Sequence, residues 1–226
     1  MDFKLIDIFF QIIVFLFAIS VHESAHAWMA NRCGDPTAKM LGRITMNPIK
    51  HMDPFGTLLL PAIGLFSGVG MFGWAKPTPV TPQNFRNPVW GDILTTLAGP
   101  VSNFLIVTLS IMALVLISIT TPRGHEVVHN LANHVLTDTA SPLMPIVWLF
   151  YTAIYLNVLL GIFNLIPVPP LDGSHVLRHL LPDPVRVLYD RAGLLGLVLL
   201  FTVGGSFIRA VMRPALHFVN SLLLNV

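Results

Sequence analysis

One long apolar run, from about Leu5 to Ala30, limits what this chain can fold into. At about 1.5 Å per residue, a helix of this length crosses roughly 30 Å of hydrocarbon. A backbone that crosses lipid must satisfy its own hydrogen bonds, which favours a helix. No small-residue cleavage site precedes the polar end of the run. We therefore expect an uncleaved first membrane helix rather than a signal peptide.

The composition is that of a membrane protein. Of 226 residues, 54% are hydrophobic and 11% are charged, against roughly 25% charged residues in an average soluble domain. The net charge of +2 gives no electrostatic case for a nucleic-acid partner. The single cysteine, Cys33, excludes an intrachain disulfide framework and a cysteine-based zinc site.

Further apolar segments predict an all-α polytopic membrane protein, a bundle of about five to six transmembrane segments. We expect a single domain over residues 1–226, with a core at about 5–180 and C-terminal membrane segments at about 187–226. The protein should be a multi-pass integral membrane protein, in the cell membrane if the source is prokaryotic. Lys and Arg nearly balance between alternate loops, so they predict no orientation. The further candidate spans are residues 56–72, 92–119, 143–165 and 187–203, while 207–226 is left open between a span and an interfacial helix.

Two stretches between the apolar segments have extended character. Residues 42–48, GRITMNP, combine β-forming side chains with an Asn-Pro turn signal. Residues 73–80, GWAKPTPV, carry prolines that forbid a helix. We expect both to form short membrane-associated strands or extended elements. The proline-rich NLIPVPPLDG that ends 143–165 must also be irregular, and such backbone is tolerated at membrane depth only where it is buried or lines a cavity.

The first apolar run ends in HESAH, which places His22 and His26 at i and i+4 with Glu23 beside them. This spacing puts two imidazoles on one helix face and is typical of a zinc site with its general base. Such groups are costly in a membrane helix unless they are satisfied, and a bound cation offsets that cost. Gln11 and Phe15 share the stripe, which we expect to face the bundle interior.

A second match to the pattern, HEVVH, covers His125 to His129 in the polar loop after residues 92–119. His134 follows at a spacing that misses the longer HExxHxxGxxH pattern. We interpret this motif as a short solvated helix with adventitious metal affinity.

A catalytic zinc usually takes three protein ligands and leaves one position for water. The candidates for the third ligand are Asp172, Asp53, His51 and His175. Asp172 follows a proline-rich break, where an unwound chain can turn a carboxylate back into the bundle. Asp53 is the next candidate, although Asp before Pro is commonly a turn or cap residue. His175 also forms an i, i+4 pair with His179, which is typical of an ordinary helix.

These stretches together resemble the site-2 protease family of intramembrane zinc metalloproteases, in its compact branch without PDZ or CBS domains. The resemblance implies that His22, His26 and Asp172 hold one Zn²⁺ per chain and that Glu23 is the general base. It also implies that Asn164 lies near the metal and stabilises an oxyanion. The matching stretches are VHESAHAWMANRCGDPTAKMLGRITMNPIKHMDPFGT, GWAKPTPV, LAGPVSN and FNLIPVPPLDGSHVL, spread over most of residues 15 to 180.

The resemblance predicts hydrolysis of peptide bonds within or near transmembrane segments of membrane protein substrates. An unwound substrate is expected to pair with residues 42–48 and 73–80 by strand addition. The expected partners are the lipid bilayer, the substrate and a separate substrate-selecting adaptor, with no oligomeric state predicted. The main alternative is a metal-ion transporter that uses the same His/Glu/Asp cluster and cleaves nothing. An inactive scaffold that binds membrane helices, and holds no metal, is a third.

Overall fold

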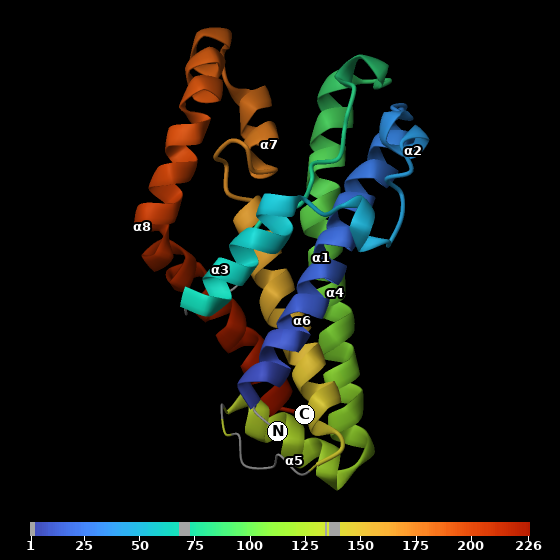
Figure 1. The fold of residues 1–226 in the computed structure, drawn as a ribbon, viewed down its shortest axis with the longest axis vertical. Coiled ribbons are helices and arrows are strands. Elements are labelled where there is room, and N and C mark those ends of the chain that lie inside the picture. The colour runs from blue at the N-terminus through green and yellow to red at the C-terminus, as the bar shows by residue number, and fades with distance from the viewer. Residues whose placement is uncertain (1–2, 68–72, 134, 136–140) are drawn as a thin grey trace.

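The computed structural model describes residues 3–67, 73–133, 135 and 141–226, and in this part of the chain the regular secondary structure is entirely helical (Figure 1). The predicted all-α polytopic architecture is confirmed. The α-helices are α1 (Phe3–Cys33), α2 (Thr37–Met40), α3 (Leu60–Ser67), α4 (Pro88–Thr120), α5 (Pro122–Ala132), α6 (Met144–Asn164), α7 (Gly173–Leu180) and α8 (Asp183–Leu224). Three shorter helical turns are η1 (Pro48–Lys50), η2 (Pro54–Leu59) and η3 (Pro82–Asn84).

Within the described residues, three helices are long and apolar enough to cross a membrane. They cover Leu5–Cys33, Pro88–Thr120 and Met144–Asn164, with mean hydropathies of 2.2, 2.3 and 2.0. α4 packs against both α1 and α6, and these three helices form the centre of the bundle (Figure 1). They match three of the predicted segments. The predicted segment 56–72 covers part of η2 and all of α3 and then runs into residues outside the described ones.

The last two predicted segments belong to one helix. α8 continues for 42 residues through Gly204 and Gly205 and contains Pro214. Glycine and proline are tolerated inside membrane helices where neighbouring groups satisfy the freed backbone.

The main core lies where α4, α5, α6 and α8 meet. Leu114, Ile154 and Leu223 are fully buried there. A smaller cluster joins α1 to α6 and includes Phe15. The predicted inward stripe of α1 is confirmed at Phe15, while Gln11 donates to the Asp7 carboxylate one turn earlier at 2.8 Å. Apolar burial of this kind stabilises the bundle around the polar part of α1.

Of the two forms expected for residues 42–48 and 73–80, short strands or extended elements, the structure shows no strand in either stretch. Residues 41–47 form turns and bends, and residues 73–81 have no regular secondary structure. The second stretch makes isolated backbone bonds, from Trp74 N–H to the Gly56 carbonyl and from Lys76 N–H to the His51 carbonyl. Prolines supply no N–H to continue a ladder.

The HEVVH motif forms α5, so the predicted short helix is confirmed. It is not fully solvated, because Val127 and Val128 are buried in the main core. The rings of His125 and His129 lie 3.9 Å apart between centroids, and His125 Nδ1 lies 3.2 Å from Ser118 Oγ. The helix packs against the C-terminal part of α8, at the end of the bundle opposite α7 (Figure 1).

Candidate metal centre

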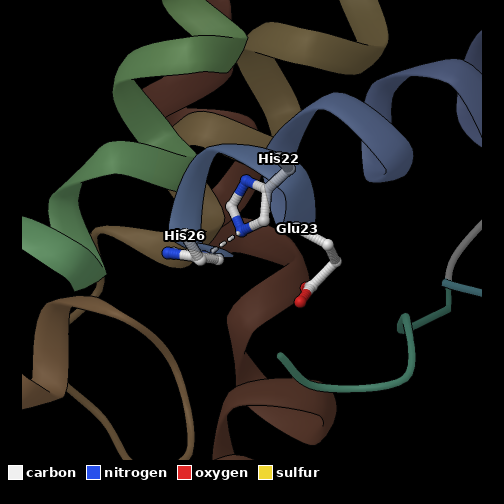
Figure 2. Close-up of side chains that lie close together, drawn as sticks. All are labelled: His22, Glu23 and His26. Atoms are coloured by element: carbon white, nitrogen blue, oxygen red, sulfur yellow. Dashed lines mark hydrogen bonds between the residues drawn. The ribbon is translucent and has the colours of Figure 1, made fainter. Parts of the chain in front are cut away.

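His22 and His26 lie one turn apart on α1 and face the interior of the bundle. Both are about 7% exposed, and their Nε2 atoms are 3.0 Å apart. Figure 2 shows the two imidazole rings together, with the Glu23 side chain extending to one side of them. A carboxylate oxygen of Glu23 lies within 4.8 Å of both histidine ligand atoms. The predicted stripe therefore brings three potential metal ligands to one place.

Hydrogen bonds on the far side of each ring determine its tautomer. His26 Nδ1 lies 2.7 Å from the Thr95 carbonyl oxygen, which only accepts, so Nδ1 carries the proton. His22 Nδ1 lies 2.7 Å from Asn103 Oδ1, and the same reasoning applies. In the neutral rings, both Nε2 atoms then present lone pairs to each other. Two lone pairs at 3.0 Å repel, and a cation between them removes the repulsion.

The orientation of the Asn103 amide is itself fixed by a chain of hydrogen bonds. Asn103 Nδ2 donates to Asn157 Oδ1 at 2.8 Å, and Asn157 Nδ2 donates to the Ala153 carbonyl at 2.9 Å. Asn103 and Asn157 are both fully buried. Because the Ala153 carbonyl can only accept, each amide in turn has one permitted orientation. The relay ends at His22 and keeps its Nε2 free for a metal.

Asp172 completes the cluster from the other end of the chain. Its Oδ2 lies 3.2 Å from His22 Nε2 and 3.4 Å from His26 Nε2. This oxygen is buried and receives no hydrogen bond. Two ligands on a tetrahedral zinc with bonds of about 2.0–2.1 Å are roughly 3.3 Å apart. The spacing of the three atoms and their exposed lone pairs therefore fit zinc.

Local backbone geometry brings Asp172 to this position. α6 ends at Asn164, and the proline-rich turn reverses the chain before α7 begins at Gly173. A Cβ on Gly173 would lie 2.5 Å from the Leu165 carbonyl carbon, so only glycine allows this close return. The LDG sequence thus turns Asp172 back into the bundle.

Glu23 is held differently from the other three residues. Its Oε2 accepts a hydrogen bond from the Thr78 backbone N–H at 2.9 Å and one from the Thr78 hydroxyl at 2.8 Å. A carboxylate fixed by two donors beside the cluster is suited to receive a proton from a water molecule. It is less suited to act as a ligand than Asp172, whose Oδ2 has no donor.

A glycine on α4 makes room for the ring pair. A Cβ on Gly99 would lie 2.5 Å from His26 Cε1 and 2.6 Å from His22 Cε1. Ordinary contacts begin at 3.4 Å. α4 can therefore approach the histidines only with glycine at this position.

The remaining sequence candidates lie elsewhere. Asp53 accepts from the Phe55 and Gly56 N–H groups and caps η2. His51 is fully buried, and its Nε2 donates to the Thr45 carbonyl at 2.9 Å. The capping role suggested by Asp before Pro is confirmed for Asp53.

Two other predicted residues make contacts outside the cluster. His175 lies against Asp92 of α4. Asn164 is the last residue of α6 and donates through Nδ2 to the Leu160 carbonyl at 3.0 Å. Its role as an oxyanion donor stays a prediction.

Sequence reasoning did not find Thr78, Thr95 or Asn157. Thr95 acts through its backbone carbonyl and Thr78 partly through its backbone N–H, which no side-chain motif marks. Asn157 is a buried amide inside an apolar helix, and that signal was available in the sequence.

A helical membrane bundle that holds two histidines, an aspartate and a neighbouring glutamate is the architecture of a membrane-embedded metallohydrolase. A family model described as Peptidase family M50 matches residues 10–201. The chain belongs to peptidase family M50 and is an intramembrane zinc metalloprotease. Nothing favours the transporter alternative.

The relatives agree with this assignment. The chain is 37% identical over 203 residues to "Putative zinc metalloprotease YwhC" of Bacillus subtilis (strain 168), covering 88% of this chain and 83% of that protein. It is 28% identical over 179 residues to "Putative zinc metalloprotease Rip2" of Mycolicibacterium smegmatis (strain ATCC 700084 / mc(2)155). That alignment covers 76% of this chain and 58% of the relative. No solved structure gave a significant match.

Proposed function

We propose that this chain is a zinc endopeptidase of the site-2 type, which hydrolyses peptide bonds within or near transmembrane segments of membrane proteins. In this proposal His22, His26 and Asp172 hold the zinc and Glu23 is the general base. The observation that carries it is the convergence of three lone-pair atoms at 3.0, 3.2 and 3.4 Å, one of them a buried oxygen without a donor.

Zinc, when bound, supplies Lewis acidity, which lowers the pKa of water towards about 7 and polarises a carbonyl. Glu23 accepts the proton of the attacking water and passes it to the leaving amine as the C–N bond breaks. The two Thr78 donors hold the Glu23 carboxylate for this transfer. Asn164 donates to the oxyanion through its second amide N–H, since Nδ2 has two and one is used by Leu160.

A transmembrane substrate must unwind before its carbonyls are accessible, and the unwound strand needs hydrogen-bond partners. We propose that it pairs with the edge of residues 73–78. Trp74 and Lys76 use their N–H and C=O groups on the side that faces residues 43–57. Ala75 lies between them, and within the described residues its backbone makes no hydrogen bond. It offers one N–H and one C=O to an added strand.

The contacts of this stretch support the proposal, because Thr78 at its end donates to Glu23. The Ala75 side chain packs against the cluster formed by α1 and α6. A photocrosslinker at residue 75 should react with a substrate peptide, and one at Val187 should not. Substrate crosslinks confined to α8 would rule out strand addition at this edge.

The main test uses purified protein in proteoliposomes with a model transmembrane peptide. Glu23→Gln should keep one zinc per chain and cleave nothing, whereas Asp172→Ala should lose most of its zinc. Glu126→Gln is the matched control, because it changes the glutamate of HEVVH and should leave zinc and cleavage unchanged. Full cleavage by Glu23→Gln would refute the assigned base, and metal flux without cleavage would favour a transporter.

A further inference from the structure

α4 contributes none of the proposed metal ligands. Its residues nevertheless contact both ligand histidines and the helix that follows Asp172. Thr95 receives the His26 hydrogen bond, Gly99 leaves room for both rings, and Asn103 orients His22. These positions are four residues apart and lie on one face of the helix. Asp92, three residues before Thr95, is on the same face.

Asp92 binds the two histidines of α7. His175 Nδ1 lies 3.1 Å from Asp92 Oδ1 and 3.2 Å from Oδ2, and His179 Nε2 lies 2.8 Å from Oδ2. The Asp92 side chain is 17% exposed. A carboxylate in a helix of this hydropathy is costly without partners. Among the described residues, the carboxylate contacts these two imidazoles, and both belong to the helix that begins directly after Asp172.

We propose that Asp92 is a positioning residue for the metal centre: by clamping His175 and His179, it fixes α7 on α4 and so holds Asp172 against the two ligand histidines. This inference rests on the proposed role of Asp172 as third ligand. With it, α4 becomes a common template that positions every ligand while contributing none.

The contacts of Asp92 with His175 and His179 lie close enough to Asp172 to fix its position. His175 is three residues beyond Asp172, so less than one helical turn separates the clamp from the ligand. Metal–ligand distances must be correct to within about 0.2 Å. A short helix fixed at two points one turn apart cannot rotate about its axis, and rotation is the motion that would withdraw Asp172. The hydrogen bond to Asp92 raises the pKa of His175, which favours an ion pair.

α7 has a second tether that serves as the control. Arg178 Nε lies 3.0 Å from Asp190 Oδ1, and both side chains are 42% exposed. This pair joins α7 to α8 and takes no part in the hydrogen bonds to Asp92. Exposed pairs contribute little. Asp190→Asn therefore removes the α8 carboxylate that binds Arg178, while the hydrogen bonds between Asp92 and the two histidines keep all of their atoms.

The experiment measures zinc affinity of the purified full chain by chelator competition, and the visible spectrum of the Co²⁺ form. Asp92→Asn should weaken zinc binding about 10- to 100-fold, the usual effect of losing a group that orients a ligand. It should also change the Co²⁺ spectrum. Asp190→Asn should stay within about threefold of wild type.

To distinguish the positioning role from a general effect on folding, Asp92→Asn is repeated in an Asp172→Ala background. If Asp92 acts through Asp172, then Asp92→Asn should not weaken zinc binding further in the Asp172→Ala protein. An equal loss in both backgrounds, or no loss in the wild type, would overturn the proposal. Cleavage is measured separately. A protein with the expected zinc coupling that cleaves nothing would refute the proposed function and leave the positioning role standing.

Discussion

Replacing Gly99 by alanine should abolish tight zinc binding, although alanine favours a helix by about 1 kcal/mol over glycine. The new methyl group would lie 2.5 Å from His26 Cε1 and 2.6 Å from His22 Cε1, so each ring or α4 must move by about 0.8–0.9 Å to reach ordinary contact at 3.4 Å. Zinc–ligand bonds tolerate about 0.2 Å. We expect at least a 100-fold loss of zinc affinity, which corresponds to about 2.7 kcal/mol.

The assay is chelator competition on purified protein in detergent, with melting temperature as a check on folding. Gly161→Ala is the control, because it adds a methyl group to another membrane helix at 3.0 Å from Phe104 Cζ, where an aromatic ring can give way. Gly161→Ala should keep wild-type zinc affinity. A Gly99→Ala protein that binds zinc within threefold of wild type would show that α4 does not press on the ligand rings.

Three further predictions follow from hydrogen bonds around the site. Thr78→Val removes the hydroxyl donor to Glu23 and should lower kcat about tenfold at unchanged zinc content, with Thr78→Ser near wild type. Asn157→Leu frees the Asn103 amide to reorient and should weaken zinc binding about 10- to 100-fold in a chelator assay; unchanged affinity would refute the relay. Burial lowers the pKa of His51, so the unfolded chain takes up the proton at a higher pH than the folded protein does. The free energy of unfolding should therefore fall as pH drops below about 6.5. In thermal melts, His51→Gln should lose less of its melting temperature at acid pH than the wild type does.

The two HExxH patterns show why a motif alone is insufficient. HEVVH folds into a helix whose histidines meet each other and Ser118, and no third ligand within the described residues joins them. HESAH lies inside the bundle, where buried imidazoles need partners on both ring nitrogens. The sequence already distinguishes HESAH from HEVVH, because only HESAH lies at the end of a long apolar run.

Much of the fold follows from the sequence alone. Apolar runs fix where helices cross, because lipid offers no hydrogen-bond partners to any other backbone form. The 3.6-residue period places His22 and His26 on one inward face with Glu23 beside them. The prolines before Asp172 predicted the break that returns this carboxylate to the bundle, although residue types left four candidates for the third ligand.

Tertiary structure decided what depends on contacts between distant segments. Asp172 is the proposed third ligand, in place of His51, Asp53 or His175, because each of those three has hydrogen-bond partners elsewhere. Asp172 Oδ2 instead faces two Nε2 atoms and has no donor. Residues 42–48 and 73–80 form no strand for a related reason, since β-pairing needs a partner edge that local propensity cannot supply. The face of α4 that contacts the proposed ligands is visible only in the tertiary structure, because a sequence records side chains but not the backbone groups they meet.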